Sequence, residues 1–193
     1  VGNEALFDIG VSGFPSHHNT AVGDSAGIDN GIGIYNTFLG AASGAANENA
    51  DNNTFVGAYA GWDNNRFNGT TTANRNTYVC SGSVYTIRSG ENNVCIGAFA
   101  DFNKNARSRC TLVGAAGGVT NNVTPALGFP AIRMAQGDDA TAFGFGTQSA
   151  TRSISIGSLA ASLGDDAVVI GYNGSTDANG DQSIAIGREA SVT

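Results

Sequence analysis

The sequence is poor in positive charge and has no long apolar run. Its 193 residues include 9 Lys and Arg against 16 Asp and Glu, which gives a net charge of −7. No basic stripe of the kind that binds a phosphate backbone is present, so we expect no nucleic-acid partner. No apolar run approaches the length of a membrane span, so we expect no membrane-spanning segment in this chain. The first ten residues do not read as a signal peptide, which says little about export if the chain is cut from a longer protein.

Catalytic and metal-binding motifs are also missing. There is no Gly-rich phosphate loop, nucleophile elbow, HExxH or CxxC motif. Cys80, Cys95 and Cys110 recur at steps of fifteen residues, which places them beyond disulfide reach in stacked coils and predicts free buried thiols. His17 and His18 are adjacent, so on a strand they point to opposite faces and fit turn positions better than a metal site. We therefore expect no enzymatic activity, no cofactor and no metal.

Glycine and a repeated phrase dominate what is present. The chain contains 28 Gly and is 41% hydrophobic, a composition that argues against disorder. A five-residue motif, in which the second and fourth residues are β-branched or apolar and the fifth is Gly in all but one case, recurs at short intervals. Most steps between motifs are 13 to 17 residues, and two are longer, at 23 and 30. The eleven motifs span residues 6–10, 19–23, 36–40, 53–57, 76–80, 93–97, 110–114, 140–144, 153–157, 167–171 and 183–187.

Self-similarity at such a period is typical of stacked repeats, in which each unit buries its apolar face against its neighbours. The alternation within each motif predicts a strand with one buried face. We expect the second and fourth residues, such as Val56 and Ile186, to point into the coil. The third residue is also apolar in many motifs, as in Phe38 and Phe55, so the other face of the strand should pack on a partner chain.

Two further columns support the stacking. A small residue stands three positions after each motif, which predicts a tight bend followed by a second short strand. Asn occupies the first position of five consecutive motifs, and stacked amides can form a hydrogen-bonded ladder; a polar binding stripe is the functional alternative. These residues are Asn19, Asn36, Asn53, Asn76 and Asn93.

Together these patterns predict an all-β fold. We expect one domain over 1–193, a parallel β-solenoid or β-roll of about eleven short coils. The long steps predict two inserted loops, near 62–75 and 115–139.

The C-terminal repeats carry a family resemblance. The strands "SISIG", "AVVIG" and "SIAIG", the last followed by "REAS", make residues 153–193 similar to the YadA-like head of trimeric autotransporter adhesins. The "NTxxG" units over 19–109 look like variant repeats of phage tail fibres and fibre-like bacterial surface proteins. The resemblance implies a left-handed roll, a homotrimer and an extracellular place on a bacterial cell-surface fibre or a phage virion tail.

Three functional classes remain open. The first is a fibre or adhesin head segment that attaches to a receptor or glycan on a host or prey cell. The second is a structural shaft with its receptor site in another domain. The third, a polysaccharide-cleaving solenoid, is disfavoured because the coils are compact, and the Asp138–Asp139 and Asp165–Asp166 pairs stand where turn residues are expected.

If the segment binds, the loops are the expected place, since loops on a rigid scaffold supply distinctive shape. Aromatic and Arg side chains there suit sugar stacking and contacts with anionic groups. The alternative is that these side chains only pack the insertions against the roll or fill a groove of the trimer. The candidates are Trp62, Arg66, Phe67, Arg75, Phe129, Ile132, Arg133 and Met134.

Overall fold

The computed structural model describes residues 1–10, 16–66, 72–85, 88–102, 106–115, 137–177 and 180–193, and within them the chain forms short strands and turns but no helix. The predicted all-β parallel solenoid is thereby confirmed. The strands are β1 (Asp8–Ile9), β2 (Thr20–Val22), β3 (Asp29–Gly31), β4 (Thr37–Leu39), β5 (Thr54–Val56), β6 (Thr77–Val79), β7 (Val94–Ile96), β8 (Thr111–Val113), β9 (Thr141–Phe143), β10 (Gln148–Ser149), β11 (Ile154–Ile156), β12 (Ala161–Ser162), β13 (Val168–Ile170), β14 (Ser175–Thr176), β15 (Ile184–Ile186) and β16 (Ser191–Val192).

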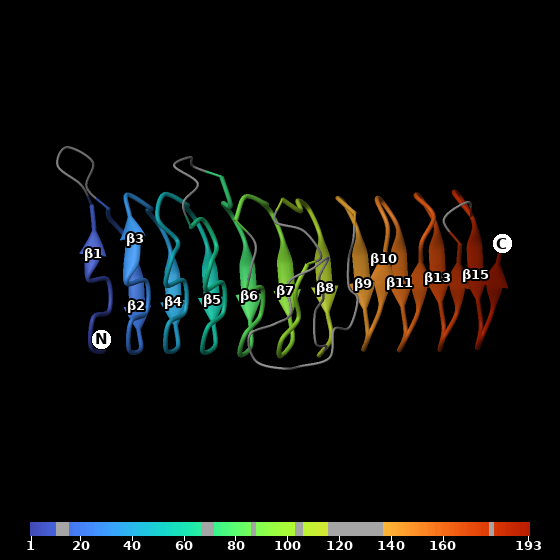
Figure 1. The fold of residues 1–193 in the computed structure, drawn as a ribbon, viewed down its shortest axis with the longest axis horizontal. Helices are drawn as coiled ribbons and strands as arrows, with labels where there is room; N and C mark the ends of the chain where they lie inside the picture. Colours follow the sequence, from blue (N-terminus) through green and yellow to red (C-terminus); the bar gives the residue numbers. More distant parts are fainter. Residues whose placement is uncertain (11–15, 67–71, 86–87, 103–105, 116–136, 178–179) are drawn as a thin grey trace.

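Stacked coils give the molecule an elongated shape, with the two termini at opposite ends (Figure 1). One ten-stranded sheet runs along its length in the order β15-β13-β11-β9-β8-β7-β6-β5-β4-β2. A four-stranded sheet, β10-β12-β14-β16, and the pair β1-β3 complete the strand pairing of the described residues. Neighbouring strands are parallel, and equivalent motif residues are register partners, as with Phe38 and Phe55.

Ten of the eleven predicted motifs form the ten-stranded sheet, so the count of eleven coils is not confirmed. The exception is 6–10, whose β1 pairs with β3 instead of β2. The closing glycine of this coil is Gly2, because its neighbour Val1 accepts a hydrogen bond from the Gly23 N–H, and a Cβ at Gly2 would collide with the Gly23 carbonyl. The apolar alternation of 6–10 predicted a main strand, but this segment follows the bend of its coil.

The inward face of the main strands is the opposite of the predicted one. The third residue is the buried one: Phe38, Phe55 and Leu112 are fully buried. The fourth residue points outward, so Val56 is half-buried and Ile186 is 66% exposed. Because both faces of these strands are apolar, alternation defined two faces without saying which one the coil encloses.

Close stacking explains the glycine that ends most strands. Gly40 adopts a φ of 136°, and a Cβ there would lie 2.6 Å from the Gly57 carbonyl in the next coil. Cys80 stands in this column with a φ of 99°. The small residues three positions later, such as Ala26 and Ala60, are fully buried, as a tight bend requires.

Three consecutive coils, those of β4, β5 and β6, have an aromatic interior and amide-lined walls. The rings of Phe55 and Tyr78 stack with centroids 4.7 Å apart, and Phe38 packs against Phe55 at 5.7 Å. The predicted Asn ladder is confirmed, but mostly as side chain to backbone: the Asn53 N–H donates to Asn36 Oδ1 and the Asn76 N–H to Asn53 Oδ1, both at 2.9 Å. The Asn column is therefore buried structure and not a surface stripe.

The shorter C-terminal coils have a smaller interior. Here the predicted second strand after the bend does form, as β10, β12, β14 and β16. In the described 17-residue coils from β4 onward, turns take its place. The inward residues are small, as with Ala142, Ser155 and Ala185. Ser155 and Ser162 share a hydrogen bond of 2.8 Å across this interior.

The two long sequence steps do not interrupt the main sheet. Thr54 is the register partner of Thr77, and Thr111 is the register partner of Thr141. The strands on either side of both steps are therefore direct neighbours in the sheet.

Candidate functional site

An aromatic and charged cluster surrounds Trp62, where the chain leaves the bend after β5. Trp62 stacks on Tyr85 of the next coil, with ring centroids 4.9 Å apart and an interplanar angle of 8°. The guanidinium carbon of Arg66 lies 4.0 Å from the centre of the indole ring. Two side chains of the same molecule therefore already occupy the surface of Trp62.

The nearly buried carboxylate of Asp63 holds this cluster together. Its Oδ1 lies 3.1 Å from Arg66 Nε, and its Oδ2 accepts a hydrogen bond of 3.0 Å from Arg88 Nε. Because the carboxylate is largely removed from water, these contacts are screened less than surface ion pairs. Asp63 thus fixes the guanidinium that lies against Trp62.

A shallow depression lies beside the cluster, and we call it the N-terminal depression. It has a volume of about 560 Å³. Its lining combines small side chains with larger groups, which are Phe7, Asp8, Ile28, Asp29, Trp62 and Arg66. None of its lining residues belongs to the ten-stranded sheet. The depression opens next to the β1-β3 pair, whose register places Asp8 opposite Asp29.

The two carboxylates give the depression an unusual electrostatic character. Partial burial raises the pKa of the Asp29 carboxyl, the nearby Asp8 carboxylate raises it further, and Arg66 partly offsets both. The phenol of Tyr85 also has a raised pKa, caused first by burial and then by Tyr59, with Asp63 adding and Arg66 opposing. The lining of the depression thus contains two carboxyl groups and one guanidinium.

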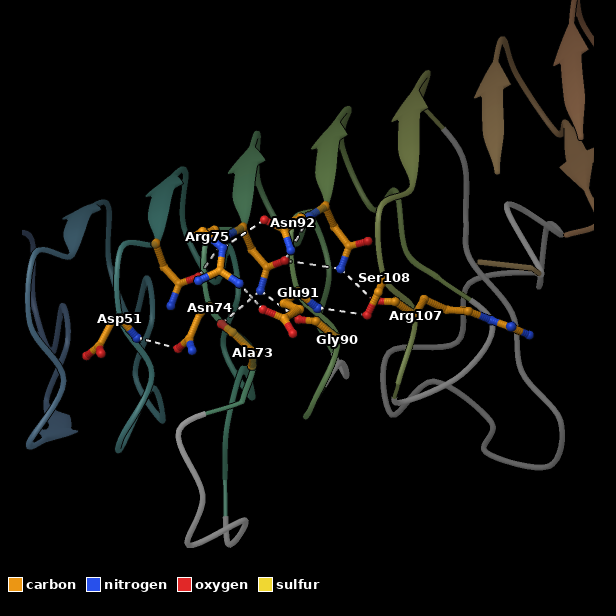
Figure 2. Close-up of polar contacts among 12 residues, drawn as sticks. Asp51, Ala73, Asn74, Arg75, Gly90, Glu91, Asn92, Arg107 and Ser108 are labelled. Carbon is orange, nitrogen blue, oxygen red and sulfur yellow. Dashed lines mark hydrogen bonds and ion pairs between the residues drawn. The ribbon is translucent and has the colours of Figure 1, made fainter. Parts of the chain in front are cut away.

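Arg75 belongs to a different group of contacts (Figure 2). It precedes β6, donates a 2.8 Å hydrogen bond from Nε to Asn92 Oδ1 and pairs with the Glu91 carboxylate. Figure 2 shows further contacts of this kind between successive coils. The Asp51 N–H donates to Asn74 Oδ1, and the Glu91 N–H donates to Ser108 Oγ. Arg75 therefore links successive coils.

The carboxylate pairs act in turns, as their positions indicated. Asp165 Oδ1 accepts a hydrogen bond from the Thr151 N–H, and Asp138 Oδ1 accepts one from the Ser108 N–H, both at 3.2 Å. Their neighbours form exposed bidentate pairs between coils, Asp139 with Arg109 and Asp166 with Arg152. The guanidinium partners hold the pKa of both carboxyls below the ordinary value.

Of the predicted binding residues, the structure brings Trp62 and Arg66 together and pairs Arg75 with other side chains. Phe67, Phe129, Ile132, Arg133 and Met134 lie outside the described residues.

Sequence reasoning missed Tyr85, Phe7 and the two carboxylates of the depression. A signal existed for Tyr85: Trp62 and Tyr85 are each five residues past the end of a motif, so the repeat stacks them. The apolar alternation of 6–10 predicts a main strand, and this prediction conceals the position of Phe7 and Asp8 at the depression. Asp29 became relevant only through its register with Asp8.

No protein-family model, curated protein or solved structure matches the chain. Within the described ranges, no helix is long and apolar enough to cross a membrane. The same residues contain no group of three His, Cys, Asp or Glu placed to hold a metal ion.

Proposed function

We propose that this chain is a segment of a homotrimeric extracellular fibre, an adhesin head that attaches to a receptor or glycan on a cell surface. The fibre would belong to a bacterial cell surface or a phage tail. The observation that carries the proposal is the column of apolar fourth motif residues on the outer face of the ten-stranded sheet, much of which is exposed in a single chain.

That outer face is a continuous apolar strip. The fourth motif residue points outward from every strand of the sheet, and large examples are exposed along its length. Toward the C-terminus the second residue is apolar as well, so Ile184 and Ile186 are 64% and 66% exposed on one strand. Folded single chains rarely expose an apolar patch of such extent, which marks an interaction surface. The exposed members in the fourth position include Val22, Leu39, Ile96, Phe143, Ile156, Ile170 and Ile186.

Copies of the same chain are the partners that this strip suits best. A strip that runs the length of the molecule matches a second strip of equal length, and closed symmetry uses the same surface on every subunit. The resemblance of residues 153–193 to YadA-like heads favours three copies and a left-handed roll. Burial of such residues contributes about 1.5–3 kcal/mol for each large side chain that leaves water.

A shaft is the second candidate. The uninterrupted register of ten parallel strands and the repeated Arg–Asp pairs between coils favour it, because they make one coil surface like the next. In that case the receptor site lies in another domain.

Sedimentation of the chain tests the assembly. We expect a species of three times the 19.5 kDa chain mass. Ile170→Asp should dissociate it, because it places a charge on the apolar strip. Leu163→Asp is the matched control: Leu163 is 39% exposed and Ile170 37%, but Leu163 lies outside the ten-stranded sheet. A wild-type monomer at micromolar concentration would contradict the trimer.

Attachment is tested separately with fluorescently labelled trimer on whole cells and on a glycan array. Saturable binding that Trp62→Ala with Arg66→Ala reduces supports the adhesin. A stable trimer that attaches to neither cells nor glycans supports the shaft.

A further inference from the structure

The N-terminal depression lies apart from the apolar strip proposed to join the three chains. Its lining lies outside the ten-stranded sheet, so chains can associate through the outer strip without using the lining residues as contacts. Its volume of about 560 Å³ falls within the range of small-ligand sites, roughly 300–1,000 Å³. The depression is thus a candidate for the ligand contact itself.

One wall of the depression is fixed before any ligand arrives. Asp63 holds Arg66, Arg66 lies against Trp62, and Trp62 stacks on Tyr85. Side chains locked in this way lose little conformational entropy on binding, which favours affinity. Trp62 is half-buried and already contacts Tyr85 and Arg66, whereas the Phe7 ring is 75% exposed and is therefore the more open aromatic surface of the depression.

The polar groups around Phe7 are mainly acceptors. Within the described part of the chain, no side chain or backbone N–H donates a hydrogen bond to the carboxylate of Asp8 or Asp29. Ionised carboxylates accept hydrogen bonds from ligand hydroxyl groups, and such charge-assisted bonds are stronger than neutral ones. Two carboxylates against one guanidinium leave the depression net negative, which disfavours ligands that carry carboxylate or phosphate.

We propose that the N-terminal depression binds a neutral hexose unit of a surface glycan, with Phe7 under the sugar ring and the carboxylates of Asp8 and Asp29 accepting its hydroxyl hydrogens. Arg66 and Trp62 form the rigid wall that positions the sugar. This inference deepens the proposed attachment function and rests on it for the choice of glycans. It replaces the expectation of anionic-group contacts at Arg66 with selection against anionic sugars.

The test is calorimetric titration of the full chain with lactose, maltotriose and mannotriose, and with sialyllactose as the acidic counterpart of lactose. We expect millimolar or tighter binding of at least one neutral sugar, and weaker binding of sialyllactose than of lactose. Phe7→Ala and Asp29→Asn should each weaken binding about tenfold or more, the first because it removes the ring under the sugar and the second because it replaces a charged hydrogen-bond acceptor with a neutral one. Asp24→Asn, an exposed acid outside the depression, is the matched control and should bind as the wild type does.

The results separate this site from the broader proposal. No binding of the three neutral sugars, unchanged binding by Asp29→Asn, or preference for sialyllactose overturns the inference. If the wild type and Asp29→Asn attach equally well to cells, the site fails while the adhesin stands. If the depression binds sugar but the trimer attaches to no cell, the site stands and the adhesin fails.

Discussion

Coils over residues 20–113 and coils over residues 141–192 stack through the same main sheet but enclose different interiors. The first set repeats mostly every 17 residues around Phe38, Phe55 and Tyr78. The second repeats every 13 to 16 residues around small side chains such as Ala142 and Ser155. The aromatic third residues all lie in the first set, whereas the second set encloses only Ala, Ser and Val at this position.

The bend has to match the size of the enclosed side chain. In the longer coils Gly44 and Gly61 follow the bend, and a Cβ at Gly44 would lie 2.3 Å from the Phe38 ring. Their φ values near 60° also lie in the left-handed region that glycine adopts without strain. In the shorter coils no ring needs this room, and a second strand forms after the bend. At Phe38 and Phe55, a glycine six positions later thus leaves room for the ring, whereas the buried Val84 occupies this position after Tyr78.

The largest expected difference separates the two faces of one strand in the longer coils. Phe55→Asp places an unpartnered carboxylate in a dry aromatic stack, which costs several kcal/mol and should prevent folding. Val56→Asp changes the adjacent residue, which points outward, and should leave the single chain folded while weakening association. Circular dichroism with thermal unfolding at low protein concentration measures both. Equal loss of stability in the two variants would show that the assigned face is wrong.

A smaller difference is expected between the two cores. Phe55→Ala should destabilise by about 3–5 kcal/mol, because it removes a ring from a packed stack and leaves a cavity. Val169→Ala in the shorter coils removes two methyl groups and should cost about 2 kcal/mol. Urea unfolding of the two variants, with the midpoint and slope fitted, provides the comparison. Similar losses of stability in the two variants would contradict the larger contribution expected from the aromatic interior.

Removing one side chain from the polar column at the first motif position should have more similar costs in the two sets of coils. Asn53→Ala leaves the buried Asn76 N–H without its acceptor and should cost about 1–3 kcal/mol. Ser153 fills the same position in a shorter coil, donating to the Gly164 carbonyl and accepting from the Ala167 N–H. We expect Ser153→Ala to cost about as much as Asn53→Ala or less, since the smaller side chain leaves a smaller void. Urea midpoints check this, and a clearly larger cost for Ser153→Ala would contradict it.

The smallest expected effect concerns acid sensitivity in the shorter coils. Arg152 lowers the pKa of Asp166, so the pair stabilises the fold at pH values above the unfolded carboxyl pKa of about 3.9. This contribution is lost as the pH falls through the lower folded value. Arg152→Gln should therefore slightly reduce stability at neutral pH and flatten its decline in acid, an effect kept small by solvent screening.

Asp29 should show the opposite sign at the N-terminal end. Its pKa is raised, so its charge costs stability above the folded value, and that cost disappears as the pH falls through it. Asp29→Asn should then be slightly more stable than the wild type at neutral pH and equal to it in acid. Thermal unfolding across pH 3–8 measures both variants. A common sign for the two would contradict the assigned pKa directions.

Much of this arrangement could be predicted from particular residues. Repetition of the phrase around Asn36 and Asn53 predicted parallel stacking in register, because only a fixed step returns the same residue to the same place. The Asn ladder followed from that register. The site was less accessible: Trp62 and Arg66 were identified, but Asp8 and Asp29 are distant in sequence and meet only through the pairing of β1 with β3.

The sequence by itself determined the period, the strand positions and the residues that stack on one another, since these depend on spacing along a chain whose repeats must pair. Only the tertiary structure decided which strand face is enclosed, because Phe55 and Val56 are both apolar and either can be buried. Enclosure depends on the direction in which the chain turns at Gly57 and on whether the loop behind the strand has room for a ring, as Gly61 provides. Equivalent turns leave the row from Val22 to Ile186 outside, and the pairing of β1 with β3 places Asp8 opposite Asp29.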